Sequence, residues 1–218
     1  NPEQVETILK KIDIAFLYAP VFHKAMKYAV GPRKEIGIRS IFNILGPLTN
    51  PAQAKTQILG VYCPVLTGTV AQVLRRLEVA NAYVVHGAGG LDEISTVGPT
   101  SVSSLRHGKI KNFVIEPEDF GFPRATLKQL QGGDAAQNAA IARSVLTGQK
   151  GPHRDIVVMN AGAALLVSDA AADLREGISL AQESIDSGRA LEKLELLVKA
   201  SRDIESMGEE KGAAHYQM

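Results

Sequence analysis

Apolar and polar residues along the chain alternate between the helix period and the strand period. Apolar side chains recur at helical spacing near the start, which predicts an amphipathic helix over about residues 3–16. Two short apolar runs, at residues 57–62 and 82–86, predict buried strands, and residues 70–77 between them have the helical period. A strand, a helix and a strand of these lengths are typical of a parallel βαβ unit.

The rest of the pattern predicts a hairpin followed mainly by helices. Residues 101–106 and 109–115 flank His107-Gly108, a dipeptide suited to a tight turn. Asp134 precedes an alanine-rich stretch, so we expect it to cap a helix that reaches about residue 146. Further helices are expected over about residues 23–29, 155–167, 170–187 and 190–201. The pattern therefore predicts the α/β class, with a central, mostly parallel sheet flanked by helices.

Composition narrows the function classes without naming one. Hydrophobic residues make up 45% of the 218 and charged residues 22%, which is the profile of a globular protein. The 24 basic and 23 acidic residues almost cancel, so no basic excess supports nucleic-acid binding. No apolar run reaches the roughly 18 residues of a membrane helix, and we expect no membrane partner. The single cysteine, Cys63, can form no internal disulfide, which favours a reducing, cytoplasmic location.

Candidate chemistry is concentrated in the glycine-rich segment His86–Glu93, which follows the second predicted strand. Open α/β sheets bind ligands at the carboxyl ends of their strands. Asp92 and Glu93 offer hard oxygen ligands there, and Mg²⁺ typically takes one or two carboxylates together with water and substrate phosphates. The residues alone leave a second interpretation open, in which the two acids stabilise a solvated helix N-terminus.

Several segments, taken together and in order, resemble the anthranilate phosphoribosyltransferase family. They are Gly37–Pro51, His86–Glu93, Gly132–Asn138, Arg154-Asp155 and Asn160-Ala161. The resemblance covers the chain to about residue 203 and implies the larger domain of a nucleoside phosphorylase/phosphoribosyltransferase-like fold. It implies transfer of a 5-phosphoribosyl group from phosphoribosyl pyrophosphate to anthranilate, with release of diphosphate, in tryptophan biosynthesis. Mg²⁺ as cofactor and a homodimer are implied as well.

The resemblance also implies roles for individual residues. Asp92 and Glu93 correspond to the family's metal-binding pair. Acceptor-binding roles fall on His23, Arg33, Gly46 and Pro47. A guanidinium can hold the anthranilate carboxylate bidentately, which suits Arg33 to this role. Without the resemblance, Arg33 is expected to be an exposed arginine and His23 a surface or packing residue. Gly46-Pro47 alone could equally let the backbone approach a ligand or form a plain turn after a helix. No catalytic base is assigned, because an aromatic amine is already neutral near pH ~7.

The family pattern is matched incompletely. Ser40 stands where the family often has Thr, and Gly89 where it often has an acidic residue. The family's Gly-Thr-Gly-Gly-Asp loop, which binds phosphoribosyl pyrophosphate, does not occur in these residues. We therefore expect residues 1–203 to form a phosphoribosyltransferase domain that is incomplete on its N-terminal side, followed by a polar tail at residues 204–218.

Two interpretations of function fit the sequence, and a third does not. The first is the transferase, with little or no turnover expected from these residues alone. A nucleoside phosphorylase would need a substrate motif that the sequence lacks. A non-catalytic binding or regulatory relative of the transferase is the alternative from another class.

Overall fold

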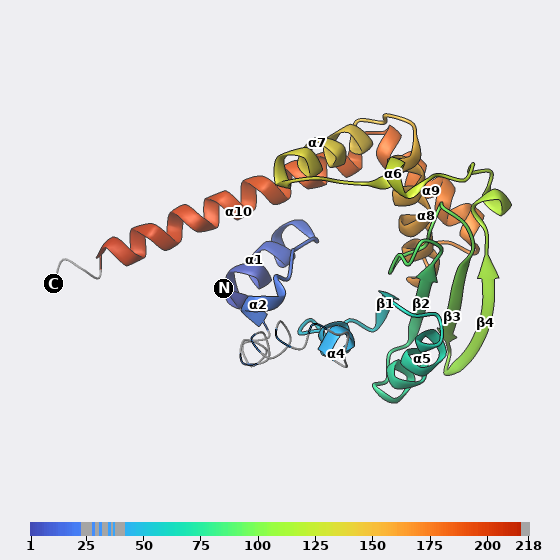
Figure 1. Ribbon diagram of the computed structural model, residues 1–218. Helices are drawn as coiled ribbons and strands as arrows, with labels where there is room; N and C mark the ends of the chain where they lie inside the picture. Colours follow the sequence, from blue (N-terminus) through green and yellow to red (C-terminus); the bar gives the residue numbers. More distant parts are fainter. Residues whose placement is uncertain (23–27, 29–30, 32–34, 36, 38–41, 215–218) are drawn as a thin grey trace. The chain divides into compact units, whose positions relative to one another are not determined.

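The computed structural model describes residues 1–22, 28, 31, 35, 37 and 42–214 (Figure 1). It divides into two compact units. One unit comprises Asn1–Gly46 together with Arg189–Met218, and the other comprises Pro47–Gly188. The divisions fall at residues 46/47 and 188/189, whereas the sequence predicted a single domain ending at residue 203.

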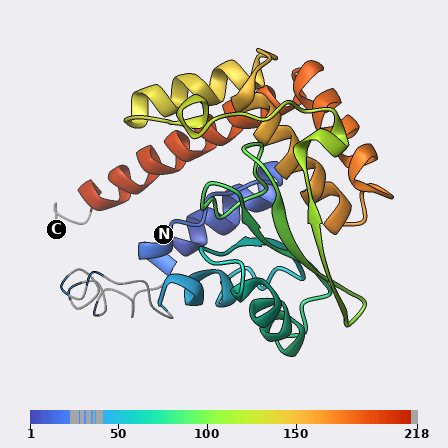
Figure 2. The same ribbon diagram turned by 45° about the vertical axis from the view of Figure 1, so that its right-hand side comes forward.

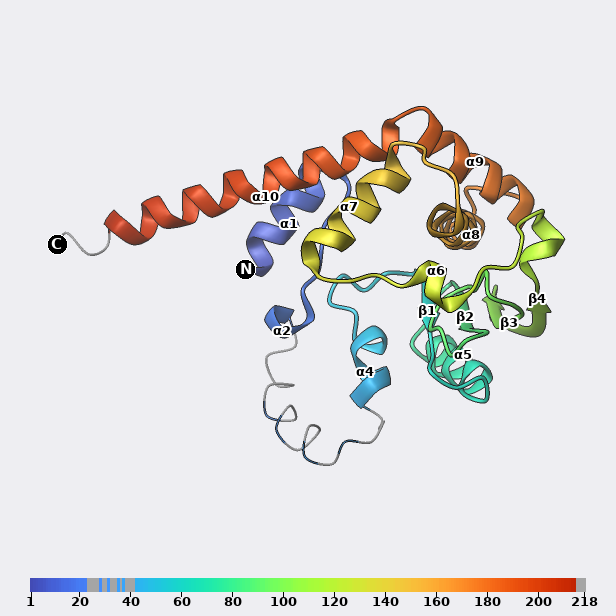
Figure 3. The same ribbon diagram turned by 45° about the horizontal axis from the view of Figure 1, so that its top comes forward.

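The first unit is built around two helices, α1 (Pro2–Ile12) and α10 (Arg189–Ala214). Asn1 caps α1 by accepting a hydrogen bond from the backbone N–H of Gln4 at 3.0 Å. The sequence pattern predicted a helix as far as residue 16, but α1 ends at Ile12. It ends there because Asp13 adopts a left-handed conformation with φ of 61°. Ile8 and Ile12 then pack with Ala200 of α10. Figure 3 shows α1 and α10 side by side.

Helix α10 extends beyond the point at which the sequence predicted a polar tail. It continues to Ala214, whereas the tail was expected to begin at residue 204. Near its start, the Nζ of Lys193 donates a hydrogen bond to the carbonyl oxygen of Ile12 at 2.7 Å. This bond satisfies one of the free carbonyls at the end of α1.

The second unit contains a four-stranded sheet in the order β1-β2-β3-β4. The strands are β1 (Thr56–Gly60), β2 (Asn81–Gly87), β3 (Thr100–Arg106) and β4 (Lys109–Ile115). Helix α5 (Leu66–Arg76) links β1 to β2, which pair in parallel as the βαβ pattern predicted. The other two ladders are antiparallel (green arrows in Figure 2).

The predicted α/β class, with helices flanking a central sheet, is confirmed, although the sheet is mixed. Of its three ladders one is parallel, because β3 and β4 follow β2 without crossover helices. The turn between β3 and β4 is the predicted dipeptide. His107 and Gly108 both have positive φ, 49° and 73°, as a tight hairpin turn requires.

Helices cover both faces of this sheet. Figure 3 shows α5 on one face and α8 (Pro152–Val167) on the other, and α9 (Leu174–Asp186) packs against α8. Gly162 and Gly177 allow α8 and α9 to approach closely, since a Cβ on Gly177 would lie 2.3 Å from the carbonyl oxygen of Gly162. The shorter elements are α2 (Ala19–Phe22), α4 (Phe42–Leu48), η2 (Pro117–Phe120) and α6 (Leu127–Leu130).

A helix cap and an ion pair stabilise the helices α7, α8 and α9. Helix α7 (Ala135–Leu146) begins where the sequence predicted, with Asp134 accepting from the N–H of Gln137 at 2.8 Å. Arg154, near the start of α8, donates to both carboxylate oxygens of Asp186 at the end of α9, at 2.8 and 2.9 Å.

Among the described residues, no helix has both the length and the apolar character needed to cross a bilayer.

Candidate functional site

The candidate site lies in the connection between β2 and β3, residues 88–99, which we call the acidic loop. It leaves the sheet at Gly87, the carboxyl end of β2, and carries Asp92 and Glu93. Gly87 and Leu91 exchange backbone hydrogen bonds of 2.8 and 3.2 Å, which closes a tight turn. Gly89 and Gly90 occupy that turn with φ of 83° and 77°, a conformation that glycine adopts without strain. The glycines of the segment His86–Glu93 thus form a tight turn directly before Asp92.

The backbone of the acidic pair, Asp92 and Glu93, lies directly on the ends of two strands. A Cβ on Gly60, the last residue of β1, would lie 1.6 Å from the carbonyl oxygen of Asp92. A Cβ on Gly87 would lie 2.5 Å from the carbonyl oxygen of Glu93. Because any side chain at these positions would overlap the loop backbone, both glycines are required for this close approach.

Asn160 of α8 fixes the residue that follows the acidic pair. The backbone N–H of Ile94 donates to Oδ1 of Asn160 at 2.9 Å, and Nδ2 of Asn160 donates to the carbonyl oxygen of Ile94 at 2.8 Å. The Ile94 side chain is fully buried. One side-chain amide therefore pairs with residue 94 as a neighbouring strand would.

Ser95 and Thr100 hold the return of the loop to the sheet. The N–H of Ser95 donates to the hydroxyl of Thr100 at 2.9 Å, and the Ser95 hydroxyl donates to the carbonyl oxygen of Ala88 at 3.0 Å. Ser95 and Thr100 are fully buried. The acidic loop is thus an ordered segment whose two ends are joined to each other, which limits the motion of the carboxylates between them.

The electrostatics of the acidic pair suit a cation. Both side chains are exposed. Partial burial of the carboxyl group raises the pKa of Glu93 above its ordinary value, and the neighbouring Asp92 carboxylate raises that pKa further. A divalent cation would offset this repulsion between like charges. Among the residues that the structure describes, no three His, Cys, Asp or Glu side chains group to hold a metal. The pair therefore fits an ion such as Mg²⁺, which completes its shell with water and phosphate oxygens.

His86 has a structural partner beside this loop. Its Nδ1 donates to the carbonyl oxygen of Val61 at 2.8 Å, since a carbonyl can only accept. Val61 in turn donates its N–H to the carbonyl oxygen of Val85 at 2.9 Å. His86 thus extends the junction between β1 and β2 beyond the strands.

The predicted acceptor-binding residues are described only in part. His23 and Arg33 lie outside the described residues. Gly46 and Pro47 lie inside α4, near its end, whereas one interpretation of the sequence placed them in a plain turn after a helix. Pro47 is exposed, and among the described residues no atom lies within 4 Å of the position that a Cβ on Gly46 would take.

Three residues of the site were not identified as functional from the sequence: Gly60, Ser95 and Asn160. Asn160 was noticed only as part of a family motif, and that motif is the one signal that could have found it. Gly60 lies within the apolar run predicted at residues 57–62, where a glycine has many explanations. Their importance follows from contacts between distant parts of the chain, such as the 66 residues that separate Ile94 from Asn160.

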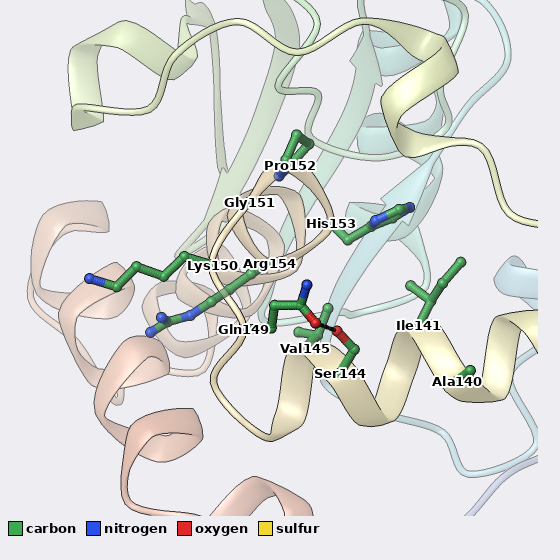
Figure 4. A pocket seen from close by; sticks show the side chains of 10 residues that line it. All are labelled: Ala140, Ile141, Ser144, Val145, Gln149, Lys150, Gly151, Pro152, His153 and Arg154. Carbon is green, nitrogen blue, oxygen red and sulfur yellow. Dashed lines mark hydrogen bonds between the residues drawn. The ribbon is translucent and has the colours of Figure 1, made fainter.

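A separate pocket of about 400 Å³ lies between α7 and the start of α8 (Figure 4). Neither Asp92 nor Glu93 lines it. The side chains of Lys150 and His153 point in different directions, as Figure 4 shows, while Arg154 is paired with Asp186. Because its polar groups do not converge, this pocket lacks the arrangement of a binding site for a charged ligand.

Comparisons with known proteins agree with the resemblance noted in the sequence. The family model described as "Glycosyl transferase family, a/b domain" matches residues 1–191. A protein of Moorella thermoacetica named anthranilate phosphoribosyltransferase is 55% identical over 197 residues, which are 90% of this chain and 58% of that protein. A protein of the same name from Acetivibrio thermocellus is 50% identical over 212 residues, 97% of this chain and 61% of that protein.

Solved structures give the same result for the fold. Anthranilate phosphoribosyltransferase from Thermus thermophilus aligns with a TM-score of 0.85 at 41% identity, covering 92% of this chain and 60% of that one. The enzyme from Saccharomyces cerevisiae in complex with PRPP and Mg aligns with a TM-score of 0.84 at 32% identity, covering 93% and 58%. The chain thus has the predicted fold, and it spans about three fifths of the length of these proteins.

Proposed function

The chain belongs to the glycosyl transferase family defined by this α/β domain, and from that premise we propose that it serves in an anthranilate phosphoribosyltransferase. The reaction is transfer of a 5-phosphoribosyl group from phosphoribosyl pyrophosphate to anthranilate, with release of diphosphate, in tryptophan biosynthesis. Support comes from the names of the relatives and from two yeast structures, one with PRPP and Mg and one with 4-fluoroanthranilate.

The observation that carries the proposal is the fixed presentation of the acidic pair. Gly60 and Gly87 let the backbone of Asp92 and Glu93 lie against the strand ends, and Asn160 holds the backbone of Ile94. A loop that only capped a helix would not need this precision. Two ordered carboxylates at the carboxyl end of a parallel strand pair suit a metal-diphosphate ligand.

The proposed mechanism relies on position and charge. In this proposal Asp92 and Glu93 hold Mg²⁺, which when bound offsets the negative charge of the departing diphosphate. Arg33 holds the anthranilate carboxylate, and His23, Gly46 and Pro47 line the space for the aromatic ring. Catalysis then comes from orienting the neutral amine toward the anomeric carbon, and no residue is required to act as a strong base.

Calorimetric titration of the 218-residue chain tests these roles separately. Asp92→Asn is expected to weaken binding of Mg²⁺ with inorganic diphosphate about tenfold, because half of the carboxylate donor set loses its charge. Arg33→Ala is expected to weaken anthranilate binding by about 1.5–3 kcal/mol, roughly 10- to 150-fold, the usual contribution of a hydrogen bond to a charged group. Each variant should leave the other ligand unaffected.

Two exposed positions provide matched controls for these variants. Glu78→Gln removes a carboxylate just after α5, and Arg76→Ala removes a guanidinium from the last turn of α5. Both controls should bind like the wild type. If Asp92→Asn and Arg33→Ala also bind like the wild type, the assignment of the site is wrong. The same substitutions can be tested in an assay of phosphoribosyl transfer to anthranilate by the protein to which this chain belongs. Turnover in that assay distinguishes a transferase from a relative that binds without reacting.

The resemblance supports two finer proposals about the protein. We propose a homodimer, which light scattering of the protein would test directly. We also propose a cytoplasmic location, consistent with a single cysteine and a biosynthetic role. Fractionation of the source cells would test the location.

A further inference from the structure

The Asn160 side chain makes three hydrogen bonds with backbone atoms. Its Oδ1 accepts from the N–H of Ile94, and its Nδ2 donates to the carbonyl oxygens of Ile94 and Ile156, at 2.9, 2.8 and 2.9 Å. The Ile156 contact is within α8 and fixes the orientation of the amide relative to its own helix. The two Ile94 contacts then transmit that orientation to the acidic loop.

These contacts restrict the chain immediately after the acidic pair. Both backbone groups of residue 94 are paired to one rigid amide, so the loop cannot rotate there without breaking two hydrogen bonds. The carbonyl oxygens of Asp92 and Glu93 lie against Gly60 and Gly87 on the preceding side. Three different elements, β1, β2 and α8, therefore fix three consecutive residues.

A fixed backbone opposes the separation that the carboxylates favour electrostatically. Asp92 and Glu93 are adjacent like charges, and a free loop would turn them apart into water. Groups that orient ligands in this way are regular features of metal sites, where their loss weakens metal binding without removing a ligand.

We propose that Asn160 is a positioning residue for the acidic pair, holding Ile94 so that Asp92 and Glu93 are oriented in advance for one divalent cation. This inference rests on the proposed function for the identity of the ligand. If Asn160 had only a structural role and its bonds merely attached α8 to the loop, its substitution would lower the stability of the chain. The affinity for the cation would then be unchanged.

Asn138 provides a matched control within the same chain. Its Oδ1 accepts from the N–H of Gly133 at 2.9 Å, and its Nδ2 donates to the carbonyl oxygen of Gly133 at 3.0 Å. The chemistry is that of Asn160 and Ile94, but Gly133 lies just before α7 and outside the acidic loop. Asn138→Ala thus removes the same kind of amide pairing at a different place.

The test compares Asn160→Ala, Asn160→Asp and Asn138→Ala with the wild-type chain. Calorimetry with Mg²⁺ and inorganic diphosphate measures affinity, and hydrogen exchange at the Ile94 amide measures order in the loop. Asn160→Ala should bind about tenfold more weakly and exchange faster at Ile94, whereas Asn138→Ala should do neither. Circular dichroism confirms that each variant is folded.

Asn160→Asp decides the question should the alanine variant not fold. The aspartate retains the shape and the acceptor for the Ile94 N–H, but an ionised carboxylate cannot donate to the two carbonyls. Its added negative charge alone would strengthen cation binding, so a weaker affinity reports lost orientation. Unchanged affinity and unchanged exchange in this variant would overturn the inference and leave the proposed function intact. No measurable binding by the wild-type chain would overturn both.

Discussion

The carbonyl oxygen of Asp92 occupies the place that a side chain at Gly60 would need. A Cβ built on Gly60 lies 1.6 Å from that oxygen and 2.3 Å from the carbonyl carbon of the same residue. The overlap is with backbone, which has no flexible end that could move aside. The last residue of β1 therefore determines how closely the acidic loop can approach the sheet.

Gly60→Ala is expected to displace the acidic loop. The strain should lower the free energy of unfolding by about 1–3 kcal/mol, as overpacking of a close contact does. Binding of Mg²⁺ and inorganic diphosphate should weaken, and amide exchange at residues 91–95 should accelerate. Ile58→Val on the same strand is a control of similar cost, about 0.5–1.5 kcal/mol. Faster loop exchange in both variants would show that the loop responds to general stability and not to this contact.

Gly162 and Gly177 allow a second close approach, between the helices α8 and α9. Gly177→Ala places a Cβ 2.3 Å from the carbonyl oxygen of Gly162, so the helices must separate. We expect a loss of about 1–3 kcal/mol in thermal or urea unfolding. Gly68→Ala in α5 is the matched control, because its Cβ would lie 4.0 Å from the hydroxyl of Ser103. That substitution should stabilise the chain by about 0.5–1 kcal/mol, since alanine favours the helix.

The ion pair between Arg154 and Asp186 predicts an effect that exposed ion pairs lack. The Arg154 side chain is 7% exposed, so Asp186→Ala leaves a buried guanidinium with fewer partners. We expect the free energy of unfolding to fall by about 1.5–3 kcal/mol, with little dependence on salt. The exposed pair of Glu6 and Lys10 on α1 is the comparison, where Glu6→Ala should cost far less because water screens both charges. Equal losses in the two variants would contradict this assignment.

Local chemistry explains which elements could be predicted from the sequence. The β3–β4 hairpin and the start of α7 were predicted closely, because His107-Gly108 and Asp134 specify a turn and a cap through their own conformations. The end of α1 was misplaced by several residues, since the apolar spacing continues past Asp13 although the backbone does not. A mostly parallel sheet was predicted, but β2 pairs antiparallel with β3, because strand direction depends on connections that the apolar period does not encode.

Some residues of the candidate site could be predicted from the sequence, and others could not. Asp92 and Glu93 were predicted from their residue types and their position after a strand, and the structure places them at the carboxyl end of β2. Asn160 and Gly60 act through contacts across the fold, which no local spacing can reveal. The roles of His23 and Arg33 remain predictions.

Glu93 makes the stability of the chain depend on pH in a direction opposite to that of most paired carboxylates. Partial burial and the Asp92 charge raise its pKa above 4.5, so the folded chain holds this proton more tightly than the unfolded chain. The stabilising contribution is complete below the ordinary pKa and is lost as pH rises through the raised value. Glu93→Gln removes this dependence, because its amide stays neutral.

Urea unfolding across a pH range of about 3–8, which spans the ordinary carboxyl pKa, should therefore show a growing difference between Glu93→Gln and the wild type. The two should match near pH ~3, and the variant should be more stable at pH ~7 by about 0.5 kcal/mol, a small value because water screens both exposed carboxylates. Glu6 provides a control of opposite sign, since its hydrogen bond and charge contact with Lys10 lower its pKa. Glu6→Gln should lose stability relative to the wild type as pH rises. A Glu93→Gln curve parallel to the wild type would show that neither partial burial nor the Asp92 charge raises the pKa of Glu93 in the folded chain.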